Sequence, residues 1–381
     1  MKTVYVGMSG GVDSSVSALL LKEHGYNVVG VYMKNWSQDL PGMKCPWADD
    51  LADAKRVAVK LGIDFKVWDF EKDYREKVVE YMLQEFKAGN TPNPDIMCNQ
   101  EIKFKLFYEK AIEDGADYIA TGHYARVDSD FLPDSNALSN PKTPSNDVPN
   151  PRLLRAIDEN KDQTYFLYRI SDEALKHTLF PIGEMTKPEV KKLAEKHGLH
   201  NAHKKESMGV CFVGDVGMKD FLKEYIEIKP GEIREAESEK VLGYHEGAIF
   251  YTIGQRHGLY LNGEKGMVND GLPYYVVSKD LEKNIVYVSK NLNHEAIWTK
   301  ELNLNNLMLR GDYVLSDFAK NENLTARLRH RAPLIPVRFM IGDEKRTTGK
   351  LIFESEIKRP ASGQSAVLYD GEVCVGGGMI I

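Results

Sequence analysis

The sequence predicts an α/β protein with an N-terminal parallel-sheet domain, a small central domain and a C-terminal antiparallel β-barrel. In the first two hundred residues, short apolar strand patterns alternate with longer helical patterns, which is typical of βαβ units with right-handed crossovers. From about Gly243 onward, short strand patterns are separated by turn residues, as in small antiparallel barrels. A chain of 381 residues is also too long for one core. We therefore expect domains at 1–212, 213–280 and 281–381.

The elements of the first domain follow from their apolar patterns. Apolar runs predict strands at 4–8, 28–33, 65–70 and 117–121. Helical patterns are expected at 14–23, 48–61, 74–87, 94–111, 163–176 and 187–197. The helix at 48–61 has the clearest pattern, because its apolar residues recur at i, i+3 and i+4 and Gly62 is placed to end it.

The second half of the chain has a different character. Residues 128–151 are rich in Asn, Ser, Pro and Asp and lack an apolar period, so we interpret them as a surface excursion with no assigned chemistry. Strands are then expected at 274–278, 285–289, 324–329, 337–341, 350–353 and 365–369.

Composition excludes several classes of protein. The 50 Lys and Arg against 56 Asp and Glu give a net charge of −6, so any nucleic-acid surface must be a local patch. The mean hydropathy is −0.41, and no apolar run approaches the roughly 18 residues of a membrane helix. The chain enters a strand at once, without a signal-peptide pattern, and its four cysteines are widely spaced. We expect a cytoplasmic protein with no membrane partner.

The strongest local signal is the segment 9–15, Ser-Gly-Gly-Val-Asp-Ser-Ser, between the first strand and the first helix. Consecutive glycines allow backbone N–H groups to point into one concavity, which the helix N-terminus reinforces as an anion site. It is neither a Walker A loop nor a dinucleotide fingerprint, because both of those patterns are absent. The alternative is a tight turn capped by Asp13 or Ser14. Together, two serines and an aspartate at this junction favour a phosphate site.

Cys98 follows a proline-stiffened turn and begins a predicted helix. A thiol at a helix N-terminus has a lowered pKa and therefore a larger thiolate fraction. Asp95, three residues earlier, is expected to cap this helix and could also transfer a proton. Taken alone, the local sequence around Cys98 favours the alternative that it packs as a small apolar residue.

Cys211 lies between Gly209 and Gly214 in a loop-like segment. Its glycine neighbours suggest a thiol that a partner can reach, although a strand cysteine buried beside Phe212 is an equal alternative. Cys45 and Cys374 have no comparable context, and we interpret both as structural.

The loop at 9–15 resembles the PP-loop of the ATP pyrophosphatases, which cleave ATP between its α- and β-phosphates. Over nearly the whole chain, the sequence resembles one family of that superfamily, the tRNA-specific 2-thiouridylases. The matching motifs are Gly-Met-Ser-Gly-Gly-Val-Asp-Ser at 7–14, Met33, Asn-Pro-Asp-x-x-Cys at 93–98, Thr-Gly-His-Tyr at 121–124, Lys-Asp-Gln-x-Tyr-Phe-Leu at 161–167, Gly-x-Cys-Phe at 209–212, Tyr-Thr-Ile-Gly-Gln-Arg-x-Gly-Leu at 251–259 and Ser-Gly-Gln-Ser-Ala-Val at 362–367. The excursion at 128–151 is longer than the family pattern.

This resemblance implies an adenine-nucleotide α-hydrolase-like (PP-loop) first domain and a reaction that thiolates the wobble uridine of tRNA. It implies adenylation of uridine O2 with release of AMP and pyrophosphate, assisted by Mg²⁺ whose ligands we leave unassigned. The residues that it places at ATP are Gly7, Met8, Ser9, Gly10, Gly11, Val12, Asp13, Ser14, Met33 and Gly122.

The resemblance also assigns the sulfur chemistry and the tRNA contacts. Cys211 would carry a persulfide received from a sulfur-donor protein, Cys98 would be the partner thiol, and Asp95 the general acid or base. Persulfide transfer and free hydrosulfide attack both remain open, and either can leave a Cys98–Cys211 disulfide. The residues implied to contact tRNA are Asn93, Pro94, Asp95, His123, Lys161, Asp162, Gln163, Arg329, His330 and Gln364.

A local basic patch is expected in the last domain. Residues 321–360 contain nine Lys and Arg against five Asp and Glu. Arg327, Arg329 and Arg331 alternate, which predicts a basic stripe on one face of a strand. An edge strand protected by charge is the alternative.

Two other functions compete with tRNA thiolation. A PP-loop ligase that forms an amide on a small molecule would use the same loop but would need neither Cys98 nor Cys211. A non-catalytic RNA-binding module would have a decayed loop, which the intact Ser9, Gly10 and Asp13 argue against.

Overall fold

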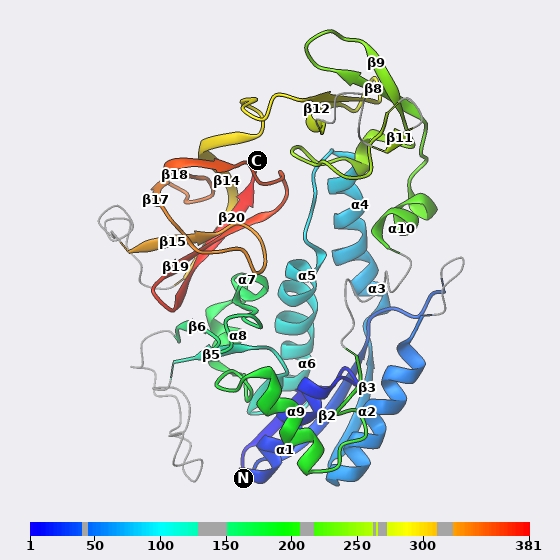
Figure 1. Cartoon of the computed structure of the whole chain (residues 1–381). Coiled ribbons are helices and arrows are strands. Elements are labelled where there is room, and N and C mark those ends of the chain that lie inside the picture. Colours follow the sequence, from blue (N-terminus) through cyan, green and yellow to red (C-terminus); the bar gives the residue numbers. More distant parts are fainter. Residues whose placement is uncertain (40–44, 129–150, 206–216, 262–263, 266–272, 311–322) are drawn as a thin grey trace.

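The computed structural model describes residues 1–39, 45–128, 151–205, 217–261, 264–265, 273–310 and 323–381 (Figure 1). The N-terminal domain contains a five-stranded sheet of order β3-β2-β1-β4-β7, and every neighbouring pair is parallel. Its strands are β1 (Thr3–Gly7), β2 (Asn27–Lys34), β3 (Asp64–Asp69), β4 (Tyr118–Thr121) and β7 (Thr178–Leu179). The predicted parallel sheet is confirmed.

The strand order reverses at β1, which has β2 on one side and β4 on the other. In open parallel sheets such a reversal leaves a crevice beyond the carboxyl ends of the strands, where ligands bind. Here Gly7 and Thr121 are register partners at those two ends. The fold therefore places the segments after Gly7 and Thr121 at the same crevice.

Helices of the N-terminal domain flank this sheet and extend from it toward the other two domains (Figure 1). They are α1 (Val12–Glu23), α2 (Trp47–Leu61), α3 (Glu71–Tyr74), α4 (Glu80–Lys87), α5 (Pro94–Met97), α6 (Phe107–Glu113), α7 (Thr164–Leu167), α8 (Asp172–Lys176) and α9 (Lys187–Lys196). Gly62 ends α2 in the left-handed conformation (φ 59°), as predicted. The predicted helix at 163–176 is instead two short helices, because Ser171 caps α8 by accepting a bond from the Ala174 N–H.

Two predicted helices contain π-helical segments. The run from α3 to α4 includes η1 (Arg75–Val79), and the run from α5 to α6 includes η2 (Cys98–Leu106). In a π-helix the hydrogen bonds join residues five apart, and such segments often occur at functional sites. Residues after Cys98 therefore face directions that an α-helical period does not predict.

The central domain contains α10 (Met218–Tyr225), the 3-10 turn η3 (Ala248–Phe250) and a six-stranded sheet of order β11-β10-β9-β8-β13-β12. Its strands are β8 (Gly231–Glu235), β9 (Val241–His245), β10 (Tyr260–Leu261), β11 (Glu264–Lys265), β12 (Tyr275–Asp280) and β13 (Ile285–Ser289). The boundary expected after residue 280 falls between the paired strands β12 and β13, so the central sheet continues to Ser289.

The C-terminal sheet is antiparallel, as expected, and its path is β16-β15-β19-β20-β14-β18-β17. These strands are β14 (Trp298–Leu309), β15 (Leu324–Arg327), β16 (Ile335–Pro336), β17 (Arg338–Ile341), β18 (Gly349–Lys358), β19 (Ser365–Asp370) and β20 (Val373–Ile380). The strands β14 and β20 were not predicted from the sequence.

A hairpin of the N-terminal domain completes this sheet. It consists of β5 (Ala125–Val127) and β6 (Leu153–Arg155), the two strands that flank the excursion predicted at 128–151. β6 pairs with β20, with Leu153 opposite Cys374. One apolar core contains side chains from both domains, among them Leu153, Tyr165 and Val367. The first and last domains are therefore joined by shared strands and a shared core.

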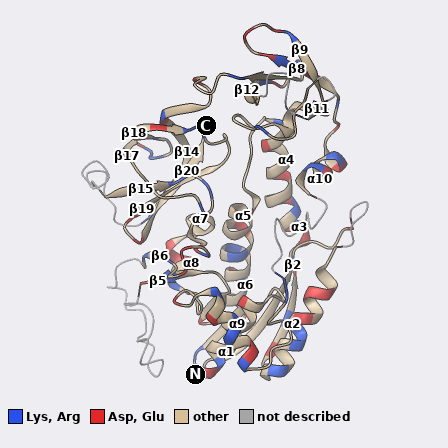
Figure 2. Cartoon of the chain, in the orientation of Figure 1, with Lys and Arg blue, Asp and Glu red and all other residues tan. Residues whose placement is uncertain are grey.

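The predicted stripe of three arginines is wrong. Arg327 ends β15 as a buried residue, and its guanidinium lies 2.6 Å from the fully buried carboxylate of Asp162. Only Arg329 and Arg331 are exposed, and Arg331 lies beyond the strand with a φ of 62°. Figure 2 shows Lys and Arg distributed over helices and strands of the described chain rather than gathered on β15.

Candidate active site

The loop between β1 and α1 has the form of an anion site. Gly10 has a φ of 78°, and a Cβ at this position would lie 2.4 Å from the backbone oxygen of Asp50. The Ser9 N–H donates to the hydroxyl of Ser14, which donates to the backbone oxygen of Gly11 at 3.1 Å. Gly11 is the N-cap and no side chain caps α1, so the alternative of a turn capped by Asp13 or Ser14 is not what the structure has. The helix N-terminus therefore faces the loop without a side-chain cap.

Asp13 is held in place from the opposite side of the loop. The ammonium of Lys187, a buried residue at the start of α9, lies 2.7 and 2.8 Å from its two carboxylate oxygens. The Tyr124 hydroxyl donates to the same carboxylate at 2.9 Å. The sequence offered no signal for Lys187, because it is 174 residues away from Asp13.

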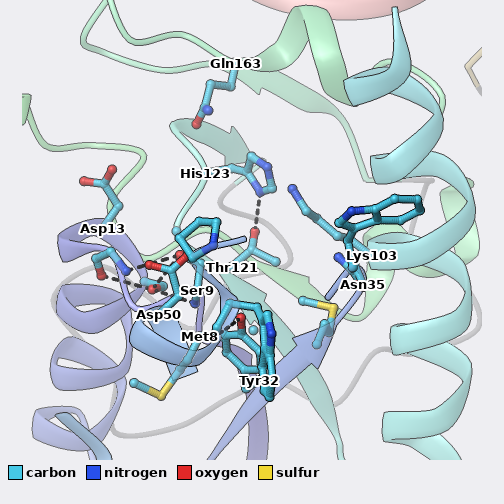
Figure 3. A pocket seen from close by; sticks show the side chains of 18 of the residues that line it. Met8, Ser9, Asp13, Tyr32, Asn35, Asp50, Lys103, Thr121, His123 and Gln163 are labelled. Carbon is cyan, nitrogen blue, oxygen red and sulfur yellow. Dashed lines mark hydrogen bonds between the residues drawn. The ribbon is translucent and has the colours of Figure 1, made fainter. Parts of the chain in front are cut away.

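A cleft of about 260 Å³ opens beside this loop, at the carboxyl ends of β1 and β4 (Figure 3). Of the residues predicted to contact ATP, those that line it are Gly7, Met8, Ser9, Gly11, Asp13, Ser14, Met33 and Gly122, which leaves out Gly10 and Val12. His123 and Gln163, predicted as tRNA contacts, line the same cleft. Residues of this cleft that the sequence analysis missed include Asp50, Lys103 and Cys45, which we had interpreted as structural.

Gly122 touches the loop directly. A Cβ on it would lie 2.5 Å from the backbone nitrogen of Ser14 and 2.7 Å from the carbonyl carbon of Asp13. We expect Gly122→Ala to weaken ATP binding about ten- to a hundredfold, because the new methyl group must displace the backbone that forms the anion site. Isothermal titration with a non-hydrolysable ATP analogue measures this. Gly115→Ala is the control. A Cβ at this position meets no other atom, but the φ of 92° is unfavourable for alanine, so this variant measures the effect of backbone strain outside the residues that line the cleft.

The segment that carries Asp95 and Cys98 is ordered by Asn93. Its side-chain oxygen accepts bonds from the N–H groups of Asp95 and Ile96, and Pro94 occupies the first turn. The predicted capping role of Asp95 is therefore wrong. Cys98 lies one turn inside the continuous helical run and is 3% exposed, packed in the core that joins the first and last domains. Cys211 lies outside the described residues.

Asp95 is half-buried, and its burial raises the pKa of its carboxyl, while the positive charge of Lys103 acts in the opposite direction. A base with a raised pKa loses its charge at a higher pH than an ordinary aspartate, which titrates near about 3.9. If ionised Asp95 is required, thiolation must fall as the pH drops through this raised pKa. We expect the acid limb of the rate profile to disappear in Asp95→Asn, together with a rate loss of about 10²-fold or more. A pH profile of kcat/KM for both proteins checks this, and an unchanged limb in the variant would contradict it.

His123 and Gln163 line the cleft, and a hydrogen bond fixes each side chain. A ring nitrogen of His123 lies 2.8 Å from the Thr121 hydroxyl, and burial lowers the pKa of this histidine well below its usual value, so it is neutral at pH 7. The side-chain oxygen of Gln163 accepts the Tyr124 N–H at 2.9 Å. Asp162, the residue before Gln163, is buried against Arg327 and so anchors the segment that carries Gln163.

The remaining predicted tRNA residues lie where the last domain meets the first. His330 packs on Phe166 with ring centroids 4.5 Å apart, and burial beside arginines lowers the pKa of His330 to about 4. The Gln364 amide donates to the Thr91 backbone oxygen at 2.7 Å, two residues before Asn93. Lys161 is half-buried, and Arg329 is exposed. This arrangement joins the segments around 93, 163 and 330.

Within the described part of the chain, no three His, Cys, Asp or Glu side chains gather in a way that could hold a metal ion by themselves. Among the same residues, none of the helices has the length and apolar character that a bilayer crossing demands.

Three family models match the chain in sequence. They are a tRNA methyl transferase HUP domain over residues 2–215, a tRNA methyl transferase PRC-barrel domain over 219–290 and an aminomethyltransferase beta-barrel domain over 304–380. These matches agree with the predicted fold class.

Relatives of known name match along almost their whole length. A protein of Bacillus subtilis named tRNA-specific 2-thiouridylase MnmA is 44% identical over 381 residues, which is 99% of this chain and 94% of the relative. One of the same name from Bacillus licheniformis is also 44% identical, and one from Listeria monocytogenes is 43% identical, with the same shares covered. By this identity and coverage, the chain belongs to the family of tRNA-specific 2-thiouridylases.

Proposed function

We propose that this protein uses ATP to replace O2 of the wobble uridine of tRNA by sulfur. One observation supports this above others: a single cleft is lined by the anion loop, by His123 and Gln163, and by the helix that carries Asp95 and Cys98, which contributes Lys103. A nucleotide and an unstacked base could meet there. Proteins recognise RNA sequence chiefly through such single-stranded bases.

In the first step, uridine O2 attacks the α-phosphorus of ATP, and pyrophosphate leaves with the electron pair of the broken P–O bond. The glycine-rich loop and the start of α1 bind the leaving pyrophosphate. Asp95 accepts the proton that N3 of the uridine gives up, since its raised pKa makes it a stronger base than an ordinary aspartate.

The donor set fits Mg²⁺ bound mainly through phosphate oxygens. This ion usually takes one or two carboxylates and keeps substrate and water oxygens as its other ligands. Asp13 and Asp50 line the cleft beside the loop and would hold it. When bound, it would neutralise negative charge on the phosphates.

In the second step, sulfur replaces the adenylated oxygen. The terminal sulfur of a Cys211 persulfide, supplied by a donor protein, bonds to C2, and AMP leaves with O2 and the electron pair of the broken C–O bond. The Cys98 thiolate then attacks the inner sulfur of Cys211, which forms a Cys98–Cys211 disulfide and leaves the electron pair on the sulfur at C2. Asp95 returns the proton to N3, and a thiol reductant restores both cysteines.

The same exchange before C–S bond formation would release hydrosulfide and form the same disulfide. Cys98 is buried in the described conformation, so either order requires the segment around it to open when tRNA binds.

The test is mass spectrometry of transcribed tRNA after incubation with the protein, ATP and a persulfide-carrying sulfur-donor protein. We expect one oxygen of the wobble uridine to be replaced by sulfur, with one AMP and one pyrophosphate released for each replacement. Reactions without ATP are the control. Pyrophosphate release that needs a small amine but no tRNA would instead favour an amide-forming ligase.

A further inference from the structure

Lys103 is a positively charged residue of the cleft to which the proposed reaction gives no role. It belongs to η2, and its half-buried side chain lines the cleft with Thr121, Gly122 and His123. Figure 3 shows it reaching from the helix toward His123, across the cleft from Asp13. It therefore extends from the helical run of Asp95 and Cys98 into the cleft that the nucleotide loop also lines.

The π-helical geometry accounts for this position. In an α-helix, a residue five places after Cys98 would point about 140° away from it, since each residue turns by about 100°. Hydrogen bonds between residues five apart reduce this angle and so turn position 103 toward the side of position 98. In agreement, the positive charge of Lys103 acts on the carboxyl of Asp95 and on His123.

Lys103 also differs from the other lysines near the cleft, because no carboxylate of the described residues forms an ion pair with it. Lys187 is paired with Asp13, and Lys204 with Asp50 and Asp53. Within the described ranges, Lys103 has no Asp or Glu at ion-pair distance, whereas its neighbour Lys105 is paired with Glu101 at 3.1 Å. A cation held in a cleft beside a phosphate loop is available to an anionic ligand.

We propose that Lys103 binds the α-phosphate of ATP and of the adenylated uridine, and stabilises AMP as it leaves. This rests on the proposed function and adds a phosphate-binding residue to it. As sulfur bonds to C2, the C2–O2 bond breaks and its electron pair moves onto the oxygen of AMP. The negative charge that develops on AMP then lies beside the ammonium of Lys103, which stabilises it without giving up a proton.

The experiment compares Lys103→Met, Lys103→Arg and Lys105→Met with the unchanged protein in the tRNA thiolation assay. We expect Lys103→Met to lower kcat by about 10²- to 10³-fold, as the loss of one preorganised charge-stabilising group does elsewhere. The kcat of Lys103→Arg should be at least tenfold higher than that of Lys103→Met, because arginine restores the positive charge. Lys105→Met removes an exposed lysine of the same helix, and its kcat should stay within twofold of that of the unchanged protein.

Two further measurements separate a phosphate contact from a structural role. The melting temperature of Lys103→Met should match that of the unchanged protein, and its KM for tRNA should change less than threefold. The proposal is overturned if kcat stays within threefold, if only the KM for tRNA rises, or if the loss follows unfolding and arginine does not restore activity. If the unchanged protein itself makes no thiolated tRNA, the proposed function fails rather than the role of Lys103.

Discussion

Cys98→Ser should abolish sulfur transfer to tRNA, with a loss of at least about 10³-fold, while ATP-dependent release of pyrophosphate continues. A serine hydroxyl cannot attack a persulfide at neutral pH, because only a thiolate is an adequate nucleophile there. The two readouts are thiolated uridine by mass spectrometry and pyrophosphate by a coupled assay. Cys211→Ser should give the same separation of the two activities.

Cys374→Ala is the matched control, since Cys374 is equally buried but lies in β20, and burial raises the pKa of its thiol to about 11. It should change stability only and keep the kcat of the folded protein. Full activity in both Cys98→Ser and Cys211→Ser would refute the thiol mechanism.

Arg327→Met should lower the free energy of unfolding by about 3 to 5 kcal/mol, because it leaves the carboxylate of Asp162 buried without its main partner. This carboxylate also accepts the Thr164 hydroxyl at 2.9 and 3.0 Å, and the Arg155 guanidinium lies 3.7 Å away. These remaining partners place the expected loss toward the lower end of the range. Urea denaturation at pH 7, followed by circular dichroism, measures it.

Arg329→Met, two residues further on and exposed, is the control and should change the unfolding free energy by less than about 0.5 kcal/mol. A double-mutant cycle with Asp162→Asn then gives the coupling between the two charges. A loss below 1 kcal/mol in Arg327→Met would show that the ion pair does not hold the last domain against the first.

Much of the N-terminal domain could be predicted because its signals are local. The strands β1, β2, β3 and β4 are short apolar runs, and Gly62 ends α2 as its position indicated. The nucleotide cleft also follows from local sequence, since parallel strands carry the segments after Gly7 and Thr121 to one edge of the sheet. Which thiols act could not be decided by packing, because Cys98, Cys45 and Cys374 are all buried.

What the sequence did not reveal depends on distant partners. Alternation of Arg327, Arg329 and Arg331 is typical of a strand face, but β15 ends at Arg327, whose partner Asp162 lies 165 residues earlier. Lys187 and Asp13 are paired over a similar distance. Lys103 was missed for another reason, since a helical period of 3.6 residues assigns it to the wrong face of a π-helical segment.

The β5–β6 hairpin has a consequence for synthesis of the chain. Among the described strands, β20 is the one that pairs with the outer edge of β6. Roughly 220 residues separate Leu154 from Val373, so closing this contact is slow compared with local folding. On the ribosome, the β6 edge of the nascent nucleotide domain therefore stays unpaired until β20 has been synthesised. An unpaired edge invites association with other chains, so chaperones that shield strands should matter most for this protein during that interval.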